Sequence, residues 1–344
     1  MLSIVYPDAR FSDDGEVERP MLAGRSDVKL SVFHERPDGT YAVPPEILAG
    51  CDVLVVYHKV KVDDRLLDLA PRCRLVVRAG VGLNNIDLKA CAARGVPVSN
   101  VPHYGTHEVA DHTIALLLTL VRGTAAYSER LRADPLKGWR FDGVAPVRRI
   151  FGSVLGIAGL GRIGIAVAER AAAFGMKIIY FGGRDRTGFE RVQSLEELYA
   201  RSDVLSLHLP LMESTRGLID ARAVALMNPG MILINTARGP LIDTAAVCEG
   251  LRSGRLAGVG LDVLPVEPPD PNDPLISAWT AREDWIRDKV VITPHAAFFS
   301  DAGFVDLRRS SMESALAFLR YGTLQNCVNE KELNASAMRR PAAR

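Results

Sequence analysis

Three side chains with complementary chemistry follow three apolar, strand-like segments in the second half of the chain. Arg238 lies in the segment NTARG, Glu267 in LDVLPVEP and His295 in TPHAA. A guanidinium can hold a carboxylate through two hydrogen bonds and polarise a neighbouring carbonyl. An imidazole can protonate a carbonyl oxygen as hydride arrives, and a carboxylate beside the ring would favour its charged form and fix its orientation. The set predicts hydride transfer to an anionic carbonyl substrate, with these three as catalytic residues.

A glycine-rich turn upstream indicates a dinucleotide. The segment GLGRIG runs from Gly159 to Gly164, follows an apolar run and opens a helical stretch. Gly159 permits the tight turn, Gly161 lets the backbone approach a pyrophosphate, and Gly164 lets helix and strand pack closely. The helix N-terminus would offer free N–H groups and a positive dipole end to the phosphates.

The end of the next strand-like segment, KIIYF, bears on the choice between NAD and NADP. An acid about 20 residues into such a unit usually accepts hydrogen bonds from the ribose of NAD. Gly182 takes that position here, and Arg184 and Arg186 follow it. A guanidinium can pair with the extra phosphate of NADP, so these residues favour NADP over NAD. Asp185 could reach the ribose after a small shift of the loop, so NAD stays open.

Alternating strand-like and helical segments must position these groups, which predicts parallel sheets covered by helices. In the first hundred residues, strands are expected at Leu2–Tyr6, Val53–Tyr57, Leu75–Arg78 and Pro97–Asn100, with helices at Asp63–Leu69 and Asp87–Arg94. A second series has strands at Val154–Ala158, Lys177–Phe181, Val204–Leu207, Met231–Asn235, Gly258–Asp262 and Val290–Thr293. Six such strands match a doubly wound dinucleotide-binding sheet.

Three further segments connect or follow these series. A helix beginning near Thr106 and ending at Gly123 carries apolar residues all round, which predicts burial on every side, between domains or between subunits. The segment EPPDPNDPLISAWTARED (residues 267–284) is rich in proline and aspartate and predicts a loop. A helix is expected over Asp301–Tyr321, and residues 331–344 are expected to be a disordered tail.

Other residues are candidates to complete the site. The backbone amides of Val81 and Gly82 could bind a substrate carboxylate as an anion nest, unless they form a plain turn. Tyr104 could line the pocket or be exposed in its loop. Asp262 could accept a hydrogen bond from the nicotinamide carboxamide or simply cap its strand, and His208 could touch the cofactor or serve packing.

Composition and charge exclude several other classes. The 344 residues can form two domains, and 42 Lys and Arg balance 41 Asp and Glu, so no nucleic-acid partner is expected. The five scattered cysteines form no CxxC pair and no metal-ligand spacing, which predicts reduced thiols and no metal site. The N-terminal segment lacks a signal-peptide pattern, and no apolar run could span a membrane. The expected location is the cytoplasm.

Taken together, the motifs GLGRIG, NTARGPLID, LDVLPVEP and TPHAA resemble the D-isomer-specific 2-hydroxyacid dehydrogenase family over residues 45–330. The resemblance implies that Arg238 is the catalytic arginine, Glu267 the acid paired with histidine and His295 the proton donor. Cofactor contacts are then expected among Val81, Thr113, Gly159, Leu160, Gly161, Arg162, Ile163, Gly164, Gly182, Arg184, His208, Pro210, Thr215, Thr236, Ala237 and Asp262.

Within the family, the segments VVRAGVGLNNIDLKA, NVPHYGTHEVADHT, PHAAFFS and QNCVN are most similar to the C-terminal binding protein branch. That branch usually has tryptophan at the position of Phe298, near substrate, and aspartate at Gly182, so its substrate and its NAD preference do not carry over. The segment YFGGRDR is instead similar to NADPH-using glyoxylate and hydroxypyruvate reductases.

The resemblance implies an α/β fold of two Rossmann-like, doubly wound parallel-sheet domains, with the active site in the cleft between them. Residues 1–101 and 297–330 would form the substrate-binding domain and residues 102–296 the dinucleotide-binding domain. A homodimer would be built around the helix that begins near Thr106.

The sequence thus predicts an NAD(P)-dependent D-2-hydroxyacid dehydrogenase, or 2-keto acid reductase, with a small acid as substrate. The alternative is a dinucleotide-sensing interaction protein, like the C-terminal binding proteins, with little turnover. A formate- or phosphite-oxidising relative is disfavoured, because formate dehydrogenases of this fold usually pair the histidine with glutamine rather than with an acid such as Glu267.

Overall fold

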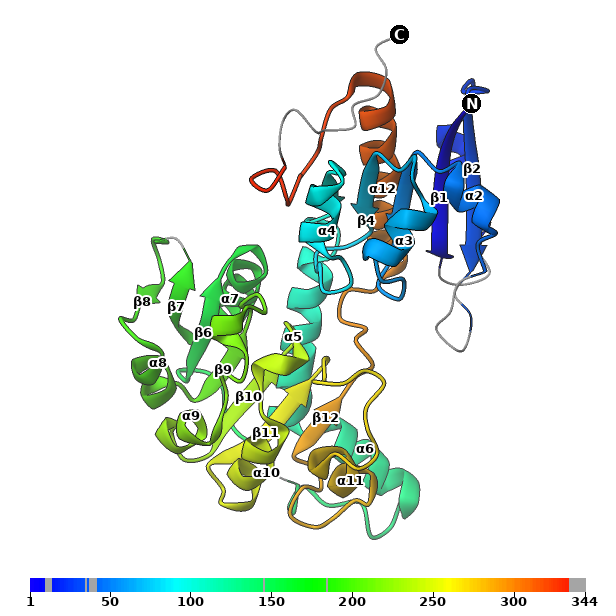
Figure 1. Cartoon of the computed structure of the whole chain (residues 1–344). Coiled ribbons are helices and arrows are strands. Elements are labelled where there is room, and N and C mark those ends of the chain that lie inside the picture. The colour runs from blue at the N-terminus through cyan, green and yellow to red at the C-terminus, as the bar shows by residue number, and fades with distance from the viewer. Residues whose placement is uncertain (10–13, 35, 37–41, 145, 184, 334–344) are drawn as a thin grey trace. The chain divides into compact units, whose positions relative to one another are not determined.

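The computed structural model describes residues 1–9, 14–34, 36, 42–144, 146–183 and 185–333. The chain divides into two compact units, one comprising Met1–Gly105 with Ser300–Arg344 and the other Thr106–Phe299. Each unit holds one parallel β-sheet with helices on both faces (Figure 1). The predicted class, α/β with two doubly wound parallel sheets, is confirmed. The domain boundaries expected from the resemblance lie at residues 101 and 297, whereas the units change at residues 105 and 299.

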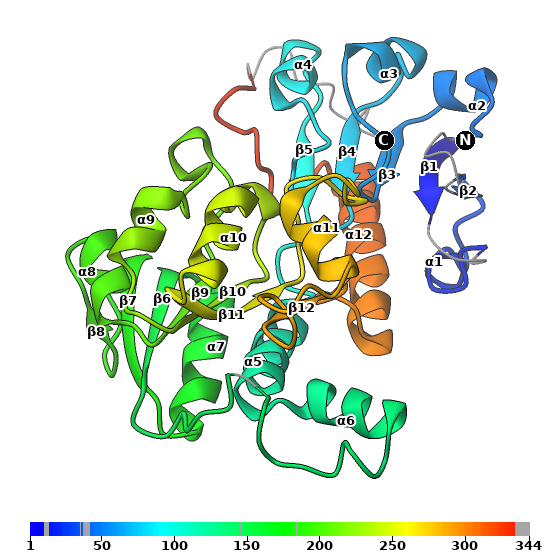
Figure 2. The same cartoon turned by 90° about the horizontal axis from the view of Figure 1, so that it is seen from below.

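The first unit is built on a five-stranded sheet in the order β2-β1-β3-β4-β5. Its strands are β1 (Leu2–Ala9), β2 (Val28–His34), β3 (Val53–Val56), β4 (Leu75–Arg78) and β5 (Val98–Asn100), and its helices are α1 (Glu18–Met21), α2 (Pro45–Ala49), α3 (Asp64–Leu69), α4 (Leu88–Ala93) and α12 (Asp301–Tyr321). Figure 2 shows α12 on one face of the sheet and α3 and α4 on the other. The strand β2 is not among the predicted strands, because Lys29 and Ser31 interrupt its apolar run. An edge strand tolerates such residues.

The second unit is built on a seven-stranded parallel sheet in the order β12-β11-β10-β9-β6-β7-β8. Its strands are β6 (Val154–Leu160), β7 (Lys177–Gly183), β8 (Glu190–Arg191), β9 (Val204–Leu207), β10 (Met231–Asn235), β11 (Leu256–Leu261) and β12 (Val290–Ile292). Its helices are α5 (Thr106–Arg122), α6 (Thr124–Ala133), α7 (Arg162–Ala173), α8 (Leu195–Arg201), α9 (Ala221–Leu226), α10 (Thr244–Arg252) and α11 (Pro274–Thr280), with the 3-10 turns η1 (Glu213–Thr215) and η2 (Gly239–Leu241). The order reverses between β6 and β9, where doubly wound sheets bind dinucleotides.

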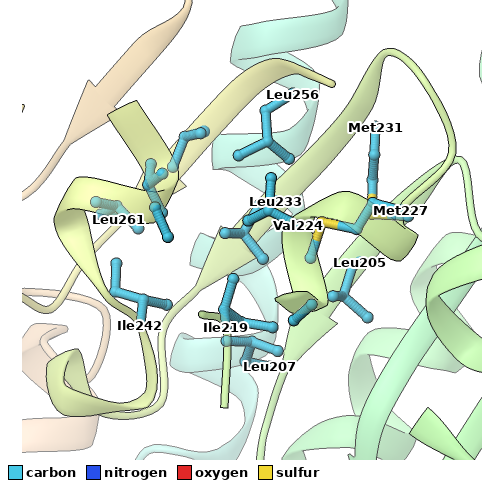
Figure 3. Packing of buried hydrophobic residues seen from close by; sticks show 14 of the residues in the cluster. Leu205, Leu207, Ile219, Val224, Met227, Met231, Leu233, Ile242, Leu256 and Leu261 are labelled. Carbon is cyan, nitrogen blue, oxygen red and sulfur yellow. The ribbon is translucent and has the colours of Figure 1, made fainter. Parts of the chain in front are cut away.

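Apolar side chains bury both faces of this second sheet. Helices α5 and α7 cover one face, and α8, α9 and α10 cover the other (Figure 2). Leu205, Leu233 and Leu261 are fully buried and pack with Val224 of α9 and Leu256 of β11 (Figure 3). Burial on both faces explains why these strands are continuous apolar runs rather than alternating ones. The core thus fixes the positions at which the strands end.

The helix α5 has the predicted bounds, and one of its faces is exposed in the single chain. His107, Asp111 and Ala115 are exposed, and their spacing of four places them on one helix face. The opposite face packs into the core of the second unit. Asp111 pairs with Arg170 of α7, 2.6 Å away. Burial of the exposed face between domains or between subunits stays a prediction.

The predicted loop over residues 267–284 is wrong for residues 274–280, which form α11. The Asp273 carboxylate accepts hydrogen bonds from the backbone N–H groups of Leu275 and Ile276, at 2.9 and 3.3 Å. Pro274 occupies the first turn, where a missing N–H costs nothing. Leu275 is fully buried. The aspartate and proline that indicated a loop are therefore the start signal of a short helix.

Other expectations concern the cysteines, the tail and membrane segments. All five cysteines are free, and only Cys327 is partly exposed. The expected tail lies, from residue 334 onward, outside the described residues. In the part of the chain that the structure describes, no single helix is long and apolar enough to cross a membrane. One bent pair, α5 with α6 at 57°, passes by length and composition alone.

Replacing the cap of α11 should destabilise the fold locally. We expect Asp273→Ala to lower the free energy of unfolding by about 0.5–2 kcal/mol, because two backbone donors lose their acceptor. A urea titration followed by circular dichroism measures the shift in midpoint. Asp284→Ala removes an exposed carboxylate whose surface pair with Arg287 should contribute little, and serves as the control. Equal midpoints for the two variants would contradict the capping role.

Candidate functional site

The three predicted catalytic residues follow three neighbouring strands of the second sheet. Arg238 follows β10, Glu267 lies in the loop after β11, and His295 follows β12. The carboxyl ends of parallel strands meet at one edge of a sheet, so the sheet brings these distant segments together. His295 Nδ1 lies 2.7 Å from Glu267 Oε2. The imidazole and the carboxylate therefore form the pair that the sequence predicted.

Glu267 is held as a carboxylate. Its Oε1 accepts a hydrogen bond from the Leu264 N–H at 2.9 Å, while its Oε2 faces His295. Burial alone would raise the pKa of Glu267, but the hydrogen bond and charge of His295, the Leu264 N–H and the charge of Arg238 together hold it below its ordinary value. The Arg238 guanidinium donates to the Ala237 carbonyl at 2.6 Å.

A glycine brings the loop of Arg238 against the loop of Glu267. A Cβ at Gly239 would lie 1.9 Å from the carbonyl carbon and oxygen of Leu264, so no larger residue fits there without moving the backbone. Asn235 fixes the other side of this loop: its Nδ2 donates to the Arg238 carbonyl at 2.9 Å and its Oδ1 accepts the Ala237 N–H at 3.0 Å.

Asn235 is a functional residue that the sequence reasoning missed. It is fully buried at the end of β10 and forms the turn that presents Arg238. An asparagine that ends an apolar strand often folds the following turn through its side chain. This signal was visible in the segment NTARG, three residues before the arginine.

Asp262 holds the turn that carries His295. Its carboxylate accepts the N–H groups of Ala296 and Ala297, each at 2.9 Å, and the Thr293 hydroxyl at 2.6 Å. Its carbonyl accepts the His295 N–H at 2.8 Å. These bonds are a capping arrangement. A carboxylate has about four acceptor positions, so one remains for a further donor such as a carboxamide.

Phe298 lies beside the imidazole. The ring centroids of His295 and Phe298 are 6.3 Å apart, with an angle of 81° between the planes, and Phe298 makes a similar edge contact with Phe299. An edge-to-face aromatic contact is favourable at this separation. Phe298 thus supports one side of the imidazole, and its predicted contact with substrate stays a prediction.

The glycine turn has the geometry that a dinucleotide needs. Gly159 adopts φ 98°, and a Cβ there would lie 2.9 Å from the His208 backbone. A Cβ at Gly164 would lie 2.4 Å from the Gly159 carbonyl oxygen, which confirms close packing of helix and strand. A Cβ at Gly161 would meet nothing within 4 Å, and Gly161 caps α7 without a side-chain bond. Open space beside uncapped N–H groups fits a pyrophosphate.

The threonines expected to contact the cofactor also form hydrogen bonds within the protein. The Thr113 hydroxyl donates to the Val109 carbonyl at 2.7 Å and lies 2.8 Å from the Thr236 hydroxyl. The Thr215 hydroxyl donates to the Pro210 carbonyl at 2.8 Å, and so shapes the loop after β9. These contacts leave the backbone and the remaining lone pairs of Thr113, Pro210, Thr215 and Thr236 available to a ligand.

His208 is a neutral residue in this site. Its Nε2 lies 2.8 Å from the Ser206 hydroxyl. Burial lowers the pKa of His208 to about 4, so the ring is uncharged at neutral pH. Its backbone touches the glycine turn, since a Cβ at Gly159 would collide with it.

The end of β7 carries no acidic side chain at the expected position. Gly182 and Gly183 have φ values of 76° and 93°. Arg184 lies outside the described residues. Asp185 pairs with Arg191 at 2.5 Å, and the Arg186 guanidinium lies 3.6 Å from the Glu169 carboxylate of α7.

Three expected substrate residues belong to the first unit. Val81 follows β4 and is 43% exposed, and its carbonyl accepts a hydrogen bond from Asn100 Nδ2 at 3.1 Å. Gly82 is partly buried. Tyr104 packs against the core of this unit rather than standing free in its loop. Among the described residues of either unit, no group of three or more His, Cys, Asp or Glu could hold a metal ion.

Comparison with known proteins decides the family. Residues 114–297 match the family described as D-isomer specific 2-hydroxyacid dehydrogenase, NAD binding domain. The chain belongs to this family. A glyoxylate reductase of Korarchaeum cryptofilum (strain OPF8) is 33% identical over 319 residues, which cover 91% of this chain and 93% of the relative. The family predicted from the motifs is therefore confirmed.

The chain is also similar to other members of known function or structure. A D-3-phosphoglycerate dehydrogenase of Mycobacterium leprae (strain TN) is 40% identical over 267 residues, covering 75% of this chain and 47% of the relative. The chain thus spans about half the length of this and several similar curated relatives. The NADPH-dependent glyoxylate/hydroxypyruvate reductase of Sinorhizobium meliloti, solved in complex with citrate, is 28% identical with a TM-score of 0.82, covering 97% of this chain and all of that one.

The lowered pKa of Glu267 makes a prediction about stability and pH. A carboxylate with a folded pKa below its unfolded value stabilises the fold above the unfolded pKa, about 4.3, and loses that contribution as pH falls through the folded pKa. The urea midpoint of wild type should therefore exceed that of Glu267→Gln near pH 6, and the difference should shrink toward pH 3. The side chain is 38% exposed, so the difference should be small. A difference that grows on acidification would contradict this assignment; Glu249→Gln is an exposed control.

Proposed function

We propose that the protein is an NAD(P)-dependent D-2-hydroxyacid dehydrogenase that reduces a small 2-keto acid. The observation that carries the proposal is the 2.7 Å contact between His295 and Glu267, with Arg238 following the neighbouring strand β10. The glycine turn that fits a dinucleotide joins the end of β6, in the same sheet, to the start of α7. Within the family, this combination supports chemistry on a hydroxy or keto acid rather than binding alone.

The ring contact supports Nε2 of His295 as the proton-donating atom. His295 Nδ1 faces Glu267, so Nε2 is the nitrogen that can give a proton to the substrate carbonyl oxygen. Glu267 stabilises the imidazolium before transfer. Arg238 holds the substrate carboxylate and polarises the adjacent carbonyl. The bound nicotinamide supplies the hydride.

The substrate class is a small 2-keto acid. Relatives of this chain include proteins named glyoxylate reductase, hydroxypyruvate reductase and D-3-phosphoglycerate dehydrogenase. Glyoxylate and hydroxypyruvate are 2-keto acids, and 3-phosphoglycerate is a 2-hydroxy acid. Glyoxylate, hydroxypyruvate, pyruvate and phosphohydroxypyruvate therefore form the first substrate panel.

Loss of the imidazole should abolish most turnover. We expect His295→Ala to lose on the order of 100-fold or more in kcat, because general acid catalysis contributes that much in typical enzymes. Cofactor binding should persist, since the glycine turn is unchanged. Steady-state kinetics on the best acid of the panel measure the loss, with exposed His107→Ala as the control. A His295→Ala enzyme as fast as wild type would rule out the proton-donor role.

We propose NADP as the preferred cofactor. Gly182 offers no carboxylate to a ribose hydroxyl or against a phosphate, and Asp185 is engaged by Arg191. Arg186 is available at the cost of its long contact with Glu169. The structural relative from Sinorhizobium meliloti is also NADPH-dependent by name.

A charge at Gly182 should reverse this preference. Its Cβ would have room, with Leu209 Cδ2 the nearest atom at 3.8 Å, and aspartate and asparagine tolerate positive φ better than most residues. Gly182→Asp should lower affinity for NADPH relative to NADH by about tenfold or more through repulsion of the 2′-phosphate. Fluorescence titration with both cofactors measures this. Gly182→Asn carries the same shape without charge and should change the ratio little; a wild-type preference for NADH would refute the proposal.

A homodimer and the C-terminal binding protein branch are further parts of the proposal. Leu136, Trp139 and Phe141 are 80–91% exposed after α6, and such an apolar surface favours association. Sedimentation at the monomer mass of 37.4 kDa alone would contradict a dimer.

A dinucleotide sensor of the C-terminal binding protein branch would bind NAD(P) tightly and reduce no acid of the panel. Turnover on the 2-keto acid panel therefore decides between the two functions.

A further inference from the structure

A chain of hydrogen bonds runs from α5 to the turn that carries His295. His112 Nε2, on α5, lies 2.9 Å from Thr293 Oγ1, and the Thr293 hydroxyl donates to Asp262 Oδ1 at 2.6 Å. The same Oδ1 accepts the Ala296 N–H. All these residues lie in the second unit. This chain of hydrogen bonds therefore joins a helix to the turn through the Asp262 carboxylate, and Asp262 is only 2% exposed.

The direction of these hydrogen bonds shows which ring nitrogen of His112 carries a hydrogen. A threonine hydroxyl has one hydrogen, and Thr293 gives it to Asp262. Thr293 Oγ1 can then only accept from His112, so Nε2 of His112 carries a hydrogen. This nitrogen also lies 3.6 Å from Asp262 Oδ1. The N–H therefore directs positive potential at the buried carboxylate.

His295 depends on such support because its backbone conformation is unfavourable. Its φ is 52°, a region that residues other than glycine rarely adopt. A residue remains there only when its surroundings hold it. Asp262 holds it through its own carbonyl and through its bonds to Ala296 and Ala297. Whatever fixes the Asp262 carboxylate also fixes the imidazole.

We propose that His112 is a positioning residue for His295, acting through Thr293 and Asp262. The inference rests on the proposed function, because it assigns His112 a part in the same reaction without contact to the reacting atoms. Its side chain is 25% exposed, and its ring contacts Thr293 of the same unit. The competing explanation is that His112 only packs α5 against the sheet.

The test compares variants that break the chain with variants that keep it. His112→Leu removes the donor, whereas the amide of His112→Gln can still donate to Thr293. Thr293→Val removes the hydroxyl, and Thr293→Ser keeps it. We expect kcat for 2-keto acid reduction to fall on the order of 10-fold in the leucine and valine variants, since a small misplacement of the reacting group is costly. KM and the cofactor Kd should stay within about twofold, and the glutamine and serine variants should recover most of kcat.

Two comparisons separate positioning from packing. The double variant His112→Leu/Thr293→Val should be no slower than the slower single variant, because both changes break one chain. His107 lies on the same helix but takes no part in this chain of hydrogen bonds, so His107→Leu should keep wild-type kcat. If His112→Leu does not fold, Thr293→Val and Thr293→Ser carry the same comparison.

A second readout needs neither cofactor nor turnover. Spectra of the cofactor-free protein labelled with ¹⁵N-histidine report the ring of His295, assigned with His295→Ala. These signals should shift in the leucine and valine variants and keep their wild-type positions in the glutamine and serine variants. Unmoved His295 signals and additive losses in kcat, at wild-type urea midpoints, would overturn the proposal. A wild type that reduces no keto acid would contradict the proposed function instead, and the spectra would still decide the role of His112.

Discussion

The buried carboxylate of Asp262 is the constraint on which the candidate site depends. It stands at the end of β11, the strand between those that lead to Arg238 and His295, and its oxygens accept three donors from the turn after β12. A buried carboxylate left without these donors would be costly. The turn cannot open without that cost, so the imidazole keeps a strained backbone and a fixed direction. The imidazole of the candidate site is thus held in place by a buried residue.

The same principle operates on the neighbouring loop. Gly239 has no Cβ, which lets the loop after β10 touch the backbone at Leu264, and Asn235 closes that loop from the other side. Glu267 then receives the Leu264 N–H on one oxygen and His295 on the other. Side chains far apart in sequence converge because three parallel strands end at one edge and each loop is held by its own buried polar group or glycine.

The sequence predicted those features that are encoded locally. Arg238, Glu267 and His295 each follow an apolar run, and the glycine turn has its spacing and its neighbours, so their convergence followed from sheet topology alone. The features that were missed depend on tertiary packing. The strand β2 was missed because Lys29 and Ser31 interrupt its apolar run, which an edge strand tolerates. The helix α11 was hidden because Asp273 and Pro274 indicate a loop as readily as a helix start.

His112 shows why a motif cannot separate contact from positioning. Its partner Thr293 lies 181 residues away, and nothing in the local pattern of α5 sets this histidine apart from His107. Asp262 poses the same ambiguity: its place at a strand end suits a cofactor acceptor, yet three of its acceptor positions already serve the protein. Thr113 and Thr236 likewise bond to each other. A residue beside a ligand site can bond both to the protein and to the ligand. Counting its hydrogen bonds within the protein shows how many donor or acceptor positions remain for the ligand.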